Sequence, residues 1–80
     1  MGARKATDKE IALAIRALTD RKGYPPTFRE LAAYVGMKSS NTISARLKRM
    51  RFKKLLTYED WKPRTLKLTD RGESLANEPA

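Results

Sequence analysis

Residues 39–54 constrain the fold of this 80-residue chain more than any other stretch; they run Ser-Ser-Asn-Thr-Ile-Ser-Ala-Arg-Leu-Lys-Arg-Met-Arg-Phe-Lys-Lys. Ile43, Leu47 and Met50 recur at intervals of four and three residues, so they share one narrow stripe of a helix. Ser39 (or Ser40) can cap the first turn, because a short hydroxyl side chain accepts hydrogen bonds from free backbone N–H groups. The pattern predicts a helix whose apolar edge is held by the rest of the fold.

The opposite edge of this helix is small and polar at its start and basic further on. Asn41, Ala45 and Lys48 project there, flanked by Ser44 and Arg49. Such an edge suits the DNA major groove, where short side chains and amides meet base edges while cations meet phosphates. Basic amphipathic helices also bind membranes and protein partners, so this helix alone leaves those classes open.

The positive charge is concentrated in the middle of the chain. Eighteen Lys and Arg stand against nine Asp and Glu, a net charge of +9. Residues 28–54 hold eight basic groups and one acidic group, whereas residues 1–27 hold six and three, and residues 55–80 hold four and five. This distribution favours a polyanionic partner.

Several functional classes are disfavoured by what the sequence lacks. With no Cys and no His, it has no disulfide, no thiolate or imidazole metal ligand and no His base. We expect no enzyme activity, catalytic site, metal, cofactor or small-molecule substrate. The basic start is not followed by an apolar run, so no secretory signal is expected. No segment approaches the roughly 20 apolar residues that span a bilayer. A cytoplasmic, nucleoid-associated protein without a membrane partner is predicted.

Two further helices are predicted before residue 39. Thr-x-x-Glu capping boxes at residues 7–10 and 27–30 begin them. The first covers residues 8–22, and the second ends at Gly36, which can adopt the positive φ of a helix end. A short Gly-containing turn then leads into residues 39–54. This is the helix-turn-helix pattern, with a plain three-helix bundle as the alternative.

After residue 54 the spacing of apolar residues changes from the helical period to the alternation of a β-strand. Short β-prone runs at residues 55–58 and 65–69 flank a turn-rich segment and predict a hairpin, with Leu66 and Leu68 toward the helices and Lys67 outward. A helical turn up to residue 76 should follow. The predicted fold is mainly α with a small β-hairpin: a winged helix-turn-helix of three helices, a wing and a short C-terminal helical turn. The expected domain is 7–76, between a flexible basic arm (1–6) and a tail (77–80).

Over about residues 8–69 the sequence resembles the N-terminal DNA-binding domain of the LexA repressor family. The matching runs are Gly-Tyr-Pro-Pro-Thr-Phe-Arg-Glu-Leu-Ala at 23–32, Val-Gly-Met-Lys-Ser-Ser-Asn-Thr at 35–42 and Lys-Pro-Arg-Thr-Leu at 62–66. The resemblance implies a sequence-specific, double-stranded DNA-binding repressor that inserts helix 39–54 into the major groove. A homodimer on a two-fold site would strengthen binding.

The same resemblance implies that Ser39, Asn41, Thr42, Ser44 and Ala45 lie against the bases, and that the hairpin, as the wing, touches the DNA backbone or minor groove. From the residues themselves, Thr27 and the cations around the helix and in the hairpin are expected at the phosphates; they are Thr27, Lys38, Lys48, Arg49, Lys53, Lys54, Lys62 and Arg64. Arg46 is nearer the apolar stripe and should lie over the core.

Three departures from the family are visible. Ser44 and Ala45 replace acidic residues of some members, so an operator sequence does not transfer. Lys53 and Lys54 stand where a glycine is common, so a non-Gly residue is expected at positive φ, at about 1 kcal/mol. The resemblance does not extend to the family's self-cleaving Ser–Lys peptidase domain, so autoproteolysis is not expected of this chain.

The rival hypothesis is a protein-interaction winged helix that modulates a regulator or polymerase through Trp61 and the acidic wing tip. A weaker one is a non-specific nucleoid or RNA binder, which the same charge permits. We expect Trp61 to fold back over the hairpin. Tyr24, Phe28 and Tyr34 are predicted in the core or at its rim.

Overall fold

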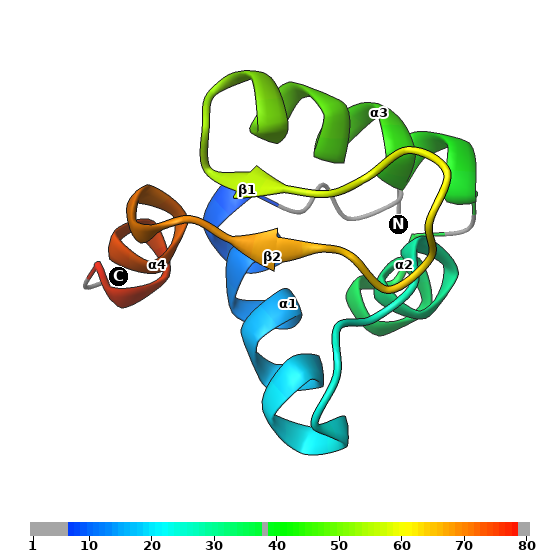
Figure 1. Cartoon of the computed structure of the whole chain (residues 1–80), viewed down its shortest axis with the longest axis horizontal. Coiled ribbons are helices and arrows are strands. Elements are labelled where there is room, and N and C mark those ends of the chain that lie inside the picture. The colour runs from blue at the N-terminus through cyan, green and yellow to red at the C-terminus, as the bar shows by residue number, and fades with distance from the viewer. Residues whose placement is uncertain (1–6, 38, 79–80) are drawn as a thin grey trace, which may run out of the picture.

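Helices surround a small core, and a two-stranded hairpin closes one side of it (Figure 1). The computed structural model describes residues 7–37 and 39–78, so the predicted arm at residues 1–6 lies outside the described residues, as does Lys38. The elements follow in the order α1 (Asp8–Lys22), α2 (Phe28–Val35), α3 (Ser40–Phe52), β1 (Leu56–Thr57), β2 (Lys67–Leu68) and α4 (Asp70–Asn77).

The start of α2 is fixed by the predicted capping box. The Thr27 hydroxyl accepts a hydrogen bond from the backbone N of Glu30 (3.1 Å), and the Glu30 carboxylate accepts one from the backbone N of Thr27 (2.9 Å). At its other end Gly36 has φ 80°, a left-handed conformation that glycine adopts without a steric penalty. Ser39 then caps α3 by accepting from the backbone N of Asn41 (3.1 Å). Helix, turn and helix therefore follow as predicted.

The core is built around the apolar edge of α3. Ile43, Leu47 and Met50 have no exposed surface, which confirms the predicted stripe. Fully burying a side chain of this size stabilises a fold by about 1.5–3 kcal/mol. Large buried side chains from α1, α2 and the hairpin complete the same cluster; they are Ile11, Ile15, Leu18, Leu31, Leu56 and Leu66.

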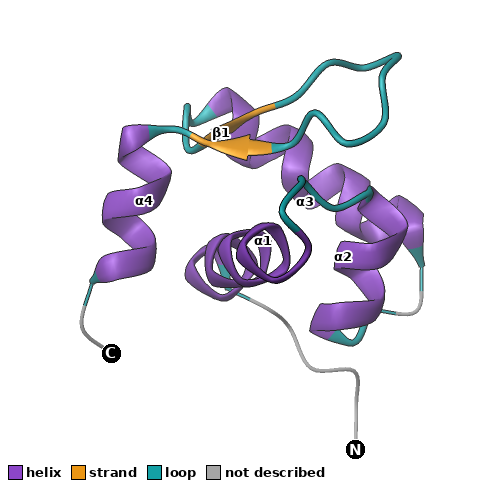
Figure 2. Cartoon of the chain, turned by 60° about the horizontal axis from the view of Figure 1, so that its bottom comes forward, coloured by secondary structure: helices purple, strands orange, loops and turns teal. Residues whose placement is uncertain are grey.

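The hairpin is shorter than the sequence suggests. Leu56 pairs with Leu68 and Thr57 with Lys67 in an antiparallel ladder, whereas the β-prone runs cover residues 55–58 and 65–69. The ladder stops there because the backbone N of Glu59 donates to the Thr65 hydroxyl (2.8 Å) instead of a strand carbonyl. Residues 59–64, called the wing loop below, belong to the connection that projects beyond the helices in Figure 2.

The winged helix-turn-helix is completed by α4, which is longer than the expected helical turn. Asn77, predicted in the tail, is its last residue, and its side-chain oxygen accepts from Arg16 of α1 (2.6 Å). Between α3 and β1, Lys54 has φ 63°, which confirms the non-glycine residue expected at positive φ there.

Gly72 permits a close approach between α4 and the segment that enters the hairpin. A Cβ at this position would lie 1.9 Å from the backbone oxygen of Leu55. The same oxygen accepts a hydrogen bond from the backbone N of Thr69 (3.1 Å), so any movement of this oxygen away from a Cβ would weaken that hydrogen bond.

Substituting Gly72 by Ala should therefore destabilise the fold, by about 1–3 kcal/mol as for other overpacked sites. Thermal and urea unfolding measure the effect. Ser74→Ala, at an exposed position of the same helix, is the matched control and should change stability little. A Gly72→Ala chain as stable as the unsubstituted one would show that α4 does not sit against Leu55 in solution.

Candidate nucleic-acid interface

The predicted base-contacting residues lie on the accessible edge of α3 and its cap. Ile43 and Leu47 point into the core, which turns the opposite edge of the helix to solvent. Four of the five predicted side chains are exposed and Ser44 is half-buried; the exposed ones are Ser39, Asn41, Thr42 and Ala45. The fold therefore leaves a small, polar helix edge free to meet a partner.

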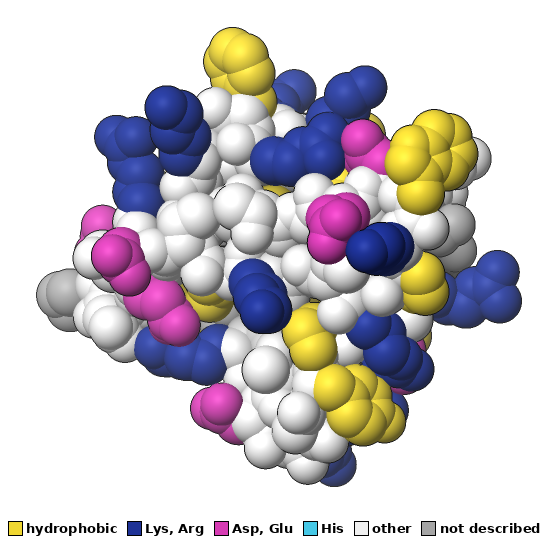
Figure 3. Space-filling model, viewed as in Figure 1, with side chains coloured by type: hydrophobic (Ala, Val, Ile, Leu, Met, Phe, Trp, Pro, Cys, Tyr) yellow, Lys and Arg dark blue, Asp and Glu magenta, His cyan; other side chains and the backbone are white. Residues whose placement is uncertain are grey.

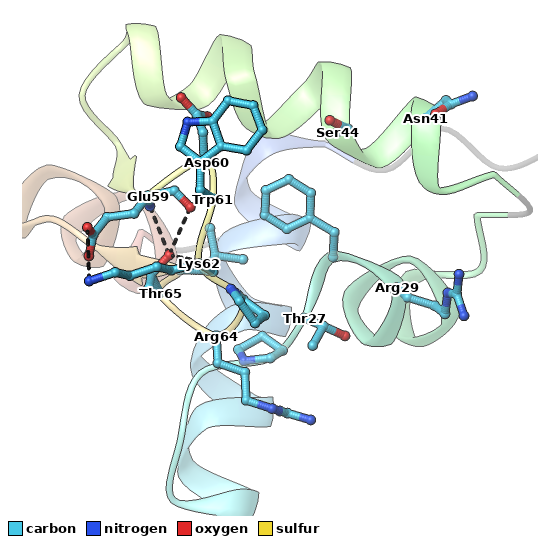
Figure 4. Close-up of a pocket in the computed structure, with 14 residues that line it drawn as sticks. Thr27, Arg29, Asn41, Ser44, Glu59, Asp60, Trp61, Lys62, Arg64 and Thr65 are labelled. Atoms are coloured by element: carbon cyan, nitrogen blue, oxygen red, sulfur yellow. Dashed lines mark hydrogen bonds and ion pairs between the residues drawn. The ribbon is translucent and has the colours of Figure 1, made fainter.

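A groove separates the first turns of α3 from the wing loop. It encloses about 480 Å³ and is lined by Asn41 and Ser44 of α3, by Arg29 of α2, by the cap Thr27 and by residues 59–66. Figure 4 shows the α3 residues on one side of this groove and the wing loop on the other. A molecule that contacts both sides must have a strand or ridge that fits between them.

Asp8 at the start of α1 binds two of the basic side chains from α3 and its C-terminal end. Its carboxylate lies 2.8 Å from an Arg46 nitrogen and 3.3 Å from Lys53 Nζ. Burial alone would raise the pKa of Asp8, but the hydrogen bonds from Arg46 and Lys53 outweigh it and lower the pKa below its usual value. Arg46 is half-buried, as expected beside the core. Its guanidinium, however, forms the ion pair with Asp8 that links α3 to α1.

Two other acids bind basic groups of the same region. Asp60 lies 3.1 Å from Arg51, whose guanidinium also stacks on Tyr58. Glu30 lies 3.0 Å from Arg64 and 3.3 Å from Lys22. Arg64 was predicted as a phosphate contact, and its guanidinium is bound within the protein.

The remaining basic side chains near α3 point into solvent. Within residues 7–37 and 39–78, no acidic side chain lies within ion-pair distance of four exposed cations, namely Arg29, Lys48, Arg49 and Lys54. Lys62 has only Glu59 at 3.9 Å. Figure 3 shows Lys and Arg gathered along α3, and acidic side chains gathered over α4.

Arg29 borders the groove although the sequence analysis did not single it out. It stands in the first turn of α2, two residues after the cap Thr27. Its position after a capping residue was a usable signal, but one Arg in an amphipathic helix is too common a feature to single out.

The aromatic predictions were only partly right. Trp61 is 95% exposed and does not fold back over the hairpin, because a ladder of two residue pairs provides no apolar face beside the wing loop. Tyr34 and Tyr24 are also exposed, not at the core rim. Phe28 is half-buried as predicted and packs edge-on against Tyr58, with ring centroids 5.0 Å apart.

The described part of the chain contains no cluster of three or more side chains of the types that bind metal ions. Nor does any helix there have the length and apolar character needed to cross a bilayer.

The pKa of Glu30 gives this region an acid-sensitive element. The backbone N–H of Thr27 first, and then Arg64 and Lys22, lower that pKa from 4.5 to about 2, against a smaller opposing effect of burial. Because the pKa is lowered on folding, the ionised carboxylate stabilises the fold above pH 4.5, and this contribution is lost as the pH falls toward 2.

We therefore expect the melting temperature of the unsubstituted chain to fall more steeply between pH 5 and pH 2 than that of Glu30→Gln. Thermal unfolding monitored by circular dichroism across this range provides the comparison. Parallel curves for the two proteins would contradict the stabilising role of the Glu30 carboxylate.

Sequence comparison matches most of this chain to one family of known proteins. The family model described as the LexA DNA binding domain matches residues 4–65. The LexA repressor of Lactobacillus helveticus is 41% identical over 64 residues, which cover 80% of this chain and 31% of that protein.

Relatives from two other bacteria give the same result. The LexA repressor of Sorangium cellulosum is 41% identical over 56 residues, covering 70% of this chain and 24% of the relative. The LexA repressor of Bacillus subtilis is 38% identical over 61 residues, which cover 76% of this chain and 30% of that protein. The chain thus spans about a third or less of the length of these relatives. By its sequence match and its fold, the chain belongs to the LexA DNA-binding domain family.

Proposed function

We propose that this chain is a sequence-specific, double-stranded DNA-binding transcriptional repressor that inserts α3 into the major groove. The observation that carries the proposal is the division of α3 into a fully buried apolar edge and an exposed polar edge. Family membership and the charge gathered along α3 support it. A protein bound to chromosomal DNA would act at the nucleoid.

Base recognition is assigned to the first turns of α3. Asn41 can form two hydrogen bonds with adenine, and the Ala45 methyl can contact the methyl group of thymine. Ser39, Thr42 and Ser44 have hydroxyl groups that can donate to or accept from base edges. All five surround the end of α3 that borders the groove.

Phosphate contacts are assigned to four exposed cations without an acidic partner among the described residues and to Lys62, whose one ion pair there, with Glu59, is long at 3.9 Å. Lys48, Arg49 and Lys54 follow the base-contacting turns, Arg29 lies across the groove on α2, and Lys62 lies in the wing loop. The Thr27 hydroxyl accepts from Glu30 N, which leaves its hydrogen for a phosphate oxygen. Lys53 would exchange Asp8 for a phosphate, and Lys38 remains a sequence-based assignment.

Two copies on a two-fold site are proposed for tight binding. A single module of this size buries only about 600–1,000 Å² on DNA. A pair of copies doubles the contacts and would give a palindromic target.

The alternative, a protein-interaction module, would use the exposed Trp61 as its contact residue. The two functions are separated by comparing Asn41→Ala with Trp61→Ala. If only Trp61→Ala loses repression in cells while Asn41→Ala keeps it, the DNA-binding proposal fails.

Selection from random duplex DNA should enrich one motif, and Asn41→Ala should weaken discrimination at a single position of that motif by about 1–3 kcal/mol. Titration of duplexes that carry each base at that position measures the change. Ser74→Ala, far from α3 in sequence, should leave the preferences intact. Selection that enriches no motif would indicate the non-specific binder instead.

Removing a phosphate contact should change the salt dependence of binding. Arg49→Ala should reduce the slope of log K against log salt by about 0.9, the value expected for one phosphate contact. Arg71→Ala removes the same charge from the exposed surface of α4, and its slope should match that of the unsubstituted chain. Equal slopes for all three proteins would remove Arg49 from the interface.

A further inference from the structure

Arg64 joins the wing loop to the segment that begins α2. Its guanidinium forms a two-pronged ion pair with Glu30: Nη1 lies 3.0 Å from Oε1 and Nη2 lies 3.2 Å from Oε2. Nη1 also donates to the backbone oxygen of Pro25 (3.3 Å), and the guanidinium lies 4.6 Å from the centre of the Tyr24 ring. One side chain thus contacts three residues that are more than 30 positions away in the sequence.

The Glu30 carboxylate is itself held in place. It accepts from the backbone N of Thr27 (2.9 Å) as part of the capping box and lies 3.3 Å from Lys22 Nζ. Arg64 therefore binds a group fixed to the helix-turn-helix, not a mobile surface acid.

The backbone at Arg64 needs such an anchor. Its φ is 62°, a conformation that is disfavoured for a residue with a Cβ. In Figure 4 the side chains of Arg64 and Trp61 extend in opposite directions from the wing loop. Arg64 thus points away from the wing tip.

We propose that Arg64 is a positioning residue that, through Glu30, fixes the wing loop at a set distance from α3. The proposal rests on the proposed DNA-binding function and deepens it. The groove between α3 and the wing loop is lined on both sides by residues assigned to DNA. The width of this protein groove must match one sugar-phosphate strand of DNA, because α3 and the wing loop would lie on either side of that strand, in neighbouring grooves of the duplex. Anchoring the loop before binding removes the cost of ordering it on DNA.

The proposal predicts that one substitution that removes a negative charge, Glu30→Gln, lowers the affinity for DNA, whereas removing negative charge ordinarily raises it. If Arg64 contacted a phosphate, Glu30 would compete for it, and Glu30→Gln would tighten DNA binding. If Arg64 positions the wing loop, Glu30→Gln weakens binding although the protein becomes more positive. Gln can still accept from the Thr27 N–H, since a capping box works with either residue.

Fluorescence anisotropy of a labelled duplex provides the first test. We expect Glu30→Gln to bind about two- to fivefold more weakly, the range for loss of a partly exposed ion pair. Glu73→Gln is the matched control, because Glu73 lies on α4 and pairs only loosely with Arg16 at 3.6 Å; it should bind as well as the unsubstituted chain or slightly better. Binding by Glu30→Gln that equals or exceeds that of the unsubstituted chain overturns the proposal.

The substitution Arg64→Lys provides a second test. Lysine keeps the positive charge but cannot form the two-pronged pair with a carboxylate. A positioning role predicts that Arg64→Lys loses nearly as much affinity as Arg64→Ala. A phosphate-contact role predicts that lysine restores most of the affinity, and that result would also overturn the proposal.

Hydrogen exchange of the DNA-free protein distinguishes failure of this proposal from failure of the proposed function. The amides of Glu59 and Lys62 donate to Thr65 and to Glu59, so they report on the order of the wing loop. In Glu30→Gln and Arg64→Ala we expect faster exchange at these amides and unchanged exchange in the core turns of α3. Unchanged exchange in the wing loop contradicts the positioning role, whether or not any duplex is bound.

Discussion

The interface depends on the complete burial of one edge of α3. Ile43, Leu47 and Met50 are fully enclosed by side chains from α1, α2 and the hairpin, so the helix cannot rotate without exposing them. Rotation is what would hide the polar edge that begins at Asn41. The orientation of α3 is therefore set by hydrophobic burial. The polar side chains on its opposite edge do not determine that orientation and remain exposed to solvent.

Three acids determine which of the positive charges remain available. Asp8, Glu30 and Asp60 bind the basic side chains that connect α3, the wing loop and the other helices. The net charge of +9 thus overstates the charge that is free near α3. Ion pairs of partly exposed groups contribute little to stability individually. Their larger effect is to hold the parts of the interface in a fixed arrangement while the unpaired cations face solvent.

Local signals predicted most of the fold. Caps, helix ends and the α3 stripe depend on residues three or four positions apart, and the contacts that confirm them, such as Thr27 with Glu30, are equally local. The length of the hairpin and the exposure of Trp61 depend on how distant segments meet, and both predictions were inaccurate. The ion pairs of Asp8 with Lys53 and of Glu30 with Arg64 join residues 45 and 34 positions apart. No spacing rule could have shown which cations the protein itself binds.

The most direct test of this account is a map of amide chemical shifts during titration with a selected duplex. If α3 enters the major groove, the largest changes fall on residues 39–45, on the start of α2 and on the wing loop, and the exposed faces of α1 and α4 change little. Changes concentrated on α1 or α4, with residues 39–45 unaffected, would contradict the central claim that the polar edge of α3 is the binding surface.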